Sequence, residues 1–158
     1  MDFPERVFTV DEVKIAKEIL DKGYRHRLVL KGSEEFQRKV NDSLALIKTA
    51  GYYDFLCTYI RQIVEIDGLS QLREAEVAIW ANLNVFEDTV DAASFIIQKV
   101  QQMKDFIDGK PYYGVKGEPK AIEKRIEFLK ALKDKSDNPL IKERCEKLLN
   151  LWSESVFP

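Results

Sequence analysis

One histidine and two cysteines are all that this chain offers for imidazole or thiol chemistry, and that scarcity excludes several kinds of site. With His26 as the only imidazole, a zinc site built on two or three histidines cannot form within one chain. A Ser-His-Asp or Cys-His catalytic arrangement would also have to use His26. This residue stands between Arg25 and Arg27 at the start of a short apolar run, a position typical of a surface or sheet-edge histidine. We therefore predict that His26 is not catalytic. For the basic cluster of Arg25, His26 and Arg27 we favour a solvated strand end over the alternative, a phosphate-binding site.

The usual patterns for phosphate loops, membranes and nucleic acids are missing as well. Neither GxxxxGKS/T nor GxGxxG occurs, so the sequence predicts no glycine-rich loop around phosphates. No apolar run approaches the roughly 18–20 residues that cross a bilayer, and the first residues carry no apolar stretch typical of a secretory signal. The 25 Lys and Arg residues are balanced by 27 Asp and Glu residues, and the net charge of −2 argues against a nucleic-acid-binding protein.

The two cysteines, Cys57 and Cys145, lie far apart in the sequence and form no CxxC pair. A single disulfide between them is one interpretation, and two buried free thiols in a reducing compartment is the one that we favour. With no secretory signal and no membrane span in the sequence, we predict a cytoplasmic protein.

Length and composition indicate one globular domain covering residues 1–158. The chain has 158 residues, of which 45% are apolar and 11% aromatic, well above the composition of a disordered segment. This length fits a single domain of about 100–200 residues. No internal repeat or Ser/Gly linker suggests a boundary.

Apolar spacing and capping residues predict mainly helices, with a few strands between them. Ile63, Val64 and Ile66 fit either a helix tail or a strand, and their β-branched side chains favour a strand. Strict alternation over 77–85 is the strongest strand signal in the chain. The fold class is therefore α+β, a helix-dominated single domain with a small mixed sheet. The predicted helices are 9–23, 33–51, 52–60, 89–108, 118–135 and 138 onward; the predicted strands are 26–31, 61–68 and 77–85, with a helical turn in 69–76.

The order of these elements from residue 28 onward is the one feature that suggests a family. A strand, a helix and two further strands precede a long helix that contains Gln98-Lys99-Val100-Gln101-Gln102, and a second long helix follows. This order, over residues 28–132, resembles the small zincin-type metallopeptidases. In those enzymes an edge strand is followed by a helix bearing HExxH, and a later helix brings a third, acidic ligand.

The resemblance implies that Gln98 and Gln102 occupy the two histidine positions and Lys99 the glutamate position. The third ligand would then fall on Glu118 or Glu123. Glutamine amides are poor zinc ligands, and the ammonium group of Lys99 repels a divalent cation and cannot act as a general base. The resemblance therefore implies a zincin-like fold, possessing neither metal nor peptidase activity, and we expect no cofactor.

Two structural interpretations of this segment remain open. In the first, Lys99 pairs with Glu118 or Glu123 and replaces the metal by an ion pair. In the second, Gln98, Lys99, Gln101 and Gln102 are simply the polar side of the helix and face water. On the following helix, Glu123, Lys124, Arg125 and Glu127 alternate in charge, which is typical of an exposed face.

The missing catalytic groups favour a non-catalytic interaction or structural domain, one that binds a protein or peptide partner or a second copy of itself. Two alternatives stay open. One is a hydrolase that uses carboxylates to hold Mg²⁺ or Mn²⁺, for which Glu65, Asp67, Glu74 and Glu76 are the candidates, although they show no recognised ligand spacing. The other is a plain helical oligomerisation module.

Overall fold

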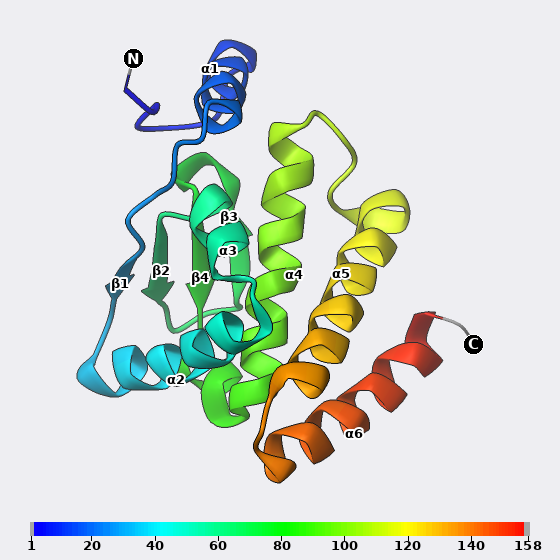
Figure 1. The fold of residues 1–158 in the computed structure, drawn as a ribbon. Helices are drawn as coiled ribbons and strands as arrows, with labels where there is room; N and C mark the ends of the chain where they lie inside the picture. The colour runs from blue at the N-terminus through cyan, green and yellow to red at the C-terminus, as the bar shows by residue number, and fades with distance from the viewer. Residues whose placement is uncertain (1, 157–158) are drawn as a thin grey trace.

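Four short strands form one mixed sheet, and six helices complete the fold of the computed structural model (Figure 1). The structure describes the backbone of residues 2–156 and the side chains of residues 2–152. This architecture confirms the predicted α+β, helix-dominated fold. The helices are α1 (Val10–Asp21), α2 (Glu34–Ala50), α3 (Tyr53–Tyr59), α4 (Thr89–Ile107), α5 (Gly114–Lys135) and α6 (Pro139–Val156); the strands are β1 (Val29–Lys31), β2 (Gln62–Glu65), β3 (Gln71–Arg73) and β4 (Ala78–Ala81), with short 3-10 helices η1 (Glu74–Glu76) and η2 (Leu83–Glu87).

The strands lie in the order β1-β2-β4-β3, with β1, β2 and β4 parallel and β3 antiparallel to β4. Because side chains alternate along a strand, the register that aligns Leu30, Ile63 and Ile79 directs all three to one face. That face belongs to the hydrophobic core shared with α2 and α4. The other face carries the more exposed Val29 and Gln62.

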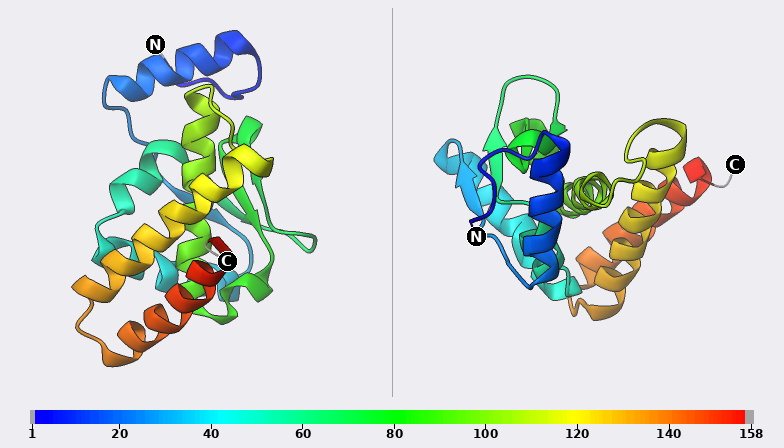
Figure 2. Two further views of the ribbon diagram at one scale, coloured as in Figure 1. Left: turned by 90° about the vertical axis from the view of Figure 1, so that its right-hand side faces the viewer. Right: turned by 90° about the horizontal axis from the view of Figure 1, so that it is seen from above.

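α4 is the central helix of the molecule. It packs against α2 and β3 on one side and α5 on the other, and α5 in turn packs against α6. Seen from above, the sheet, α4 and the α5–α6 pair follow one another (Figure 2). The side chain of Asp88 caps α4 by accepting hydrogen bonds from the amides of Val90 and Asp91. No helix among the described residues is long and apolar enough to cross a membrane.

The strand predicted over 77–85 is shorter than its alternating pattern and lies in the sheet interior, not at an edge. β4 ends at Ala81 because the next residue starts a turn: the Asn82 amide donates to Ser70 Oγ at 2.8 Å, and the Asn82 side chain accepts from the Asn84 amide at 3.0 Å. Residues 83–87 then form η2. The antiparallel edge strand is β3, a part of the 69–76 segment for which we predict only a helical turn.

Two other predicted boundaries are also wrong. β1 covers only Val29–Lys31, so the predicted strand 26–31 begins three residues too early. α5 starts at Gly114, four residues before the predicted 118, and Pro119 lies inside it. The early start depends on Gly117, which lies so close to the preceding loop that a Cβ atom there would come within 2.3 Å of the Tyr112 carbonyl carbon.

Candidate functional site

A layer of polar side chains fills the interface between α4 and α5, where soluble proteins usually place apolar residues. At its centre lies Arg125, which is 5% exposed. Its guanidinium donates to Ser94 Oγ at 2.8 Å, to Gln98 Oε1 at 2.7 Å and to the Asp91 carboxylate at 2.7 Å. The guanidinium carbon also lies 4.3 Å from the centroid of the Trp152 ring on α6. Arg125 therefore joins three helices through one buried cation.

The exposed face predicted for Arg125 is wrong. The residue does carry a signal of burial, because Ala121, Phe128, Leu129 and Leu132 on α5 are also buried and lie at helical spacing from it. Arg125 thus occupies a position within the apolar stripe of α5. Its partners on α4 lie 27–34 residues away in the sequence, so no local pattern identifies them.

Gln98, Lys99 and Gln102 lie together next to this layer, and each is engaged by protein groups. Gln98 accepts from Arg125, and Gln102 Nε2 donates to the Tyr112 carbonyl at 2.8 Å. Lys99 Nζ donates to Gln102 Oε1 at 3.1 Å and lies 5.4 Å from the Phe95 ring centroid. The interpretation that this side faces water is wrong, because Gln101 and Gln102 are buried and Gln98 and Lys99 are half-buried.

The ion pair expected between Lys99 and Glu118 or Glu123 does not form among the described residues, and both carboxylates are exposed. Burial lowers the pKa of Lys99, the positive charge of Arg125 lowers it further, and Glu118 opposes both effects. The strongest electrostatic neighbour of Lys99 is therefore a cation. Zinc does not fit this set of residues, since the amides already have partners and a cation stands at the glutamate position.

The polar layer continues toward the end of α4 at Asp105, which is 1% exposed. Its Oδ1 accepts from Gln101 Nε2 at 3.0 Å and from Lys120 Nζ at 3.2 Å. Its Oδ2 has no hydrogen-bond partner among the described residues. Two cations of α5, Lys120 and Arg125, thus join it to α4 by charge-assisted hydrogen bonds.

Replacing Lys99 with Met is expected to raise the free energy of unfolding by about 1 kcal/mol, because it removes a desolvated cation beside Arg125 and keeps the apolar stem. Urea denaturation measures the change. Lys116→Met, an exposed lysine on α5, is the control and should change stability by less than about 0.5 kcal/mol. A clear loss of stability in Lys99→Met would instead indicate a favourable ion pair with Glu118.

The carboxylates proposed for a Mg²⁺ or Mn²⁺ hydrolase do not converge. Glu65 ends β2 beside Ala81, where its Oε1 accepts from the Ser33 amide at 2.8 Å. Glu74 and Glu76 follow β3, near the Ala78 end of β4 and therefore at the opposite end of the sheet. Among the described residues, no group of three or more His, Cys, Asp or Glu side chains is arranged to hold a metal ion.

A groove of about 400 Å³ runs beside β3, and we call it the β3 groove. Among the described strands, only β4 pairs with β3, and no backbone hydrogen bond joins the outer edge of Gln71–Arg73 to another described segment. A second hollow of about 450 Å³, mostly apolar, adjoins it, and Phe8 and Phe106 line both. The β3 groove is lined by Arg6, Phe8, Gln71, Leu72, Arg73, Glu74, Ala75, Glu76, Phe106 and Tyr112.

His26 is buried, which corrects its predicted position at the surface. It is 6% exposed, and its ring lies 4.5 Å from the Phe3 centroid and 5.1 Å from the Tyr24 centroid. Its Nε2 has no hydrogen-bond partner among the described residues. Burial, and then the charge of Arg61, lower the pKa of His26 to about 4, so the imidazole is neutral at neutral pH.

Comparison with known proteins adds no relative. No protein-family model, no curated protein and no solved structure matches this chain. The resemblance to zincin-type peptidases therefore depends on the order of elements and on the motif positions alone.

Proposed function

We propose that this chain is a non-catalytic domain that binds an extended peptide segment of a partner protein along the outer edge of β3. The observation that carries the proposal is the unpaired edge itself, which forms one wall of a groove. Backbone N–H and C=O groups on such an edge pair readily with an added strand. Phe8, which is 71% exposed, and the half-buried Phe106 and Tyr112 supply apolar surface for the side chains of the peptide.

The zincin-like relationship is part of this proposal. Its support is that α4, with Gln98, Lys99 and Gln102, packs against the antiparallel edge strand β3, and that α5 contributes Arg125 to the same region. If the domain descends from a zincin-type peptidase, it would keep the groove for an extended peptide after the metal ligands were lost. The buried hydrogen bonds of Arg125 would then hold together the helices that the metal ligands once joined.

A cytoplasmic location belongs to the proposal too. Cys57 and Cys145 are both buried and free, as predicted, which suits a reducing compartment. Burial raises the pKa of the Cys145 thiol to about 11, so this thiol stays protonated and unreactive at neutral pH.

Panning a library of random 12-residue peptides tests the proposal. Peptides enriched on the wild-type protein should bind Phe8→Asp at least about tenfold more weakly, because a charge replaces an exposed aromatic contact in the groove. Leu140→Asp is the matched control: Leu140 is 74% exposed and lies outside the groove, and this variant should bind like the wild type. Both positions are exposed, so neither change should unfold the protein.

Hydrogen exchange identifies the site of binding independently. A peptide that adds as a strand should slow exchange of outward-facing amides within Gln71–Arg73 and leave the other edge strand, β1, unchanged. Failure of any peptide to enrich, equal binding by Phe8→Asp, or protection confined to other elements would contradict the proposal.

A further inference from the structure

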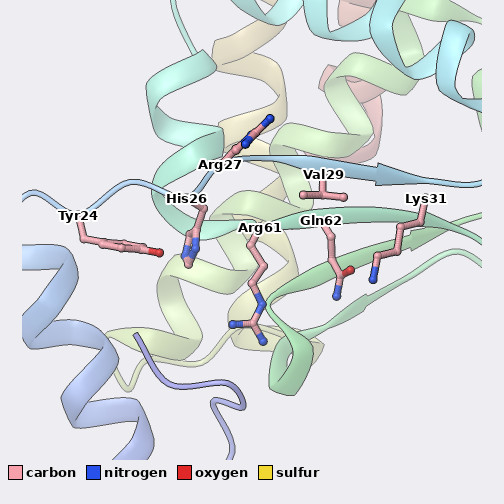
Figure 3. Close-up of a pocket in the computed structure, with 7 residues that line it drawn as sticks. All are labelled: Tyr24, His26, Arg27, Val29, Lys31, Arg61 and Gln62. Atoms are coloured by element: carbon pink, nitrogen blue, oxygen red, sulfur yellow. The ribbon is translucent and has the colours of Figure 1, made fainter. Parts of the chain in front are cut away.

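Another pocket, of about 410 Å³, lies at the opposite edge of the sheet from the β3 groove. It is formed by the segment before β1, by β1 itself and by the start of β2 (Figure 3). In the close-up, the side chains of His26, Arg61, Gln62 and Lys31 are directed to the same side of the sheet, whereas Arg27 is directed to the other side. The lining residues are Tyr24, His26, Arg27, Val29, Lys31, Arg61 and Gln62.

Several polar groups of this pocket have no protein partner. The side chains of Lys31 and Gln62 make no hydrogen bond or ion pair with any described residue. His26 Nε2 is also without a partner, although the side chain is 94% buried, since its exposed fraction is 6%. Buried polar atoms normally have partners, so an orphan in the wall of a pocket points to a group that is bound there.

Arg61 is held in place by backbone carbonyls and not by an ion pair. Its Nη1 donates to the Pro4 carbonyl at 3.1 Å, its Nε donates to the Glu76 carbonyl at 3.2 Å, and its Nη2 donates to the Glu5 carbonyl. No carboxylate of a described residue lies within ion-pair distance of it. Because a guanidinium has five N–H donors, two remain for a ligand.

The charges of the lining determine the class of ligand. Lys31 and Arg61 bring two positive charges to one side of the sheet, and no Asp or Glu of the described residues lines the pocket. A phosphate dianion matches two cations, whereas a carboxylate would balance only one of them. Ammonium, guanidinium and amide N–H groups are also the usual donors to phosphate oxygens.

We propose that this pocket binds a phosphate group, either as inorganic phosphate or as the monoester of a small molecule, through Lys31, Gln62 and Arg61, with His26 in the wall behind them. The site is separate from the β3 groove, so this proposal does not depend on whether the groove binds a peptide.

Titration with inorganic phosphate and with phenyl phosphate at constant ionic strength tests this inference. Because His26 is the only histidine, its imidazole NMR signals report on the pocket without ambiguity. Each probe should shift these signals and those of the Gln62 amide. For a given probe, all of the shifts should follow the same saturable binding curve. Tighter binding of phenyl phosphate would support a monoester as the ligand, and equal or tighter binding of inorganic phosphate would support the free ion.

Variants of exposed residues keep the test independent of folding. Lys31→Gln should weaken binding about tenfold, the cost of one charge-assisted contact. Lys116→Gln makes the same change of net charge on α5, away from the pocket, and should bind within about twofold of the wild type. Non-saturable shifts, equal binding by Lys31→Gln, or acetate binding as tight as phosphate would overturn the inference.

Discussion

Combining Asp91→Ala with Arg125→Met is expected to give a protein that is more stable than Asp91→Ala alone. The single change leaves the Arg125 guanidinium, which is 5% exposed, without its carboxylate. An unpaired buried charge is costly, and we expect Asp91→Ala to lower the free energy of unfolding by about 3 kcal/mol. Removing the charge as well should recover about half of that loss.

Methionine suits position 125 because the side chains around this position include both aliphatic and aromatic groups. Phe128 and Leu129 are buried on the same helix, and the Trp152 ring already lies against the side chain. The former partners of Arg125 keep other contacts: Ser94 Oγ donates to the Asp91 carbonyl at 2.7 Å, and Gln98 is half-buried and can reach water. The double variant therefore leaves few buried polar groups unsatisfied.

Asp91 also stands in the first turn of α4, where a negative charge stabilises a helix by itself. Asp11→Ala is the control, since Asp11 is exposed and occupies the first turn of α1. It should cost about 0.5 kcal/mol. Urea denaturation of the wild type, Asp91→Ala, the double variant and Asp11→Ala makes these comparisons. A double variant no more stable than Asp91→Ala would show that the bonds of Arg125 to Ser94 and Gln98 carry the stability instead.

The parts of the fold that could be predicted from sequence are those decided by neighbouring residues. Thr9 and Glu12 form the predicted capping box of α1, and Ser33 caps α2 as its spacing indicates. The ends of strands are harder to predict from the sequence. The alternation over 77–85 continues past Ala81, where hydrogen bonds of Asn82, one of them to Ser70 across a loop, end the strand. Alternation alone does not detect such a turn.

The candidate sites are the hardest features to predict from the sequence, because each depends on residues that are distant in the chain. Gln98, Lys99 and Gln102 do lie together, but helical spacing alone ensures that. What they contact is decided by Arg125 and Tyr112, and β3 becomes an edge only through its pairing with β4. The burial of His26 depends in the same way on a distant residue: Phe3, which covers its ring, lies 23 residues earlier in the chain.

The burial of His26 makes stability depend on pH between about 5 and 7, where no other side chain of this protein ordinarily titrates. The groups that face the imidazole are the rings of Phe3 and Tyr24 and the guanidinium of Arg61. None of these is an acid that would favour the imidazolium. The pKa of His26 is about 4 in the folded protein, against 6.5 for an unperturbed histidine.

The sign of the effect follows from proton binding by the two states. Above about pH 6.5 neither state binds the proton, and the full stability is present. Between 6.5 and about 4 the unfolded chain binds the proton while the folded protein does not, so stability falls as the pH falls. From pH 7 to pH 5 the free energy of unfolding should decrease by about 2 kcal/mol through this residue alone.

His26→Phe should abolish this decrease, because a third aromatic ring fits between Phe3 and Tyr24 and does not titrate. Urea denaturation of both proteins at pH 7 and pH 5 measures the difference, and the imidazole NMR signal of the wild type reports the titration of His26 directly. An equal decrease in the free energy of unfolding of the two proteins between pH 7 and pH 5, or a titration midpoint near pH 6.5, would mean that water reaches the ring. In that case Phe3 does not keep water away from the imidazole. The N-terminal segment, which Arg61 binds through the Pro4 and Glu5 carbonyls, then opens readily in solution.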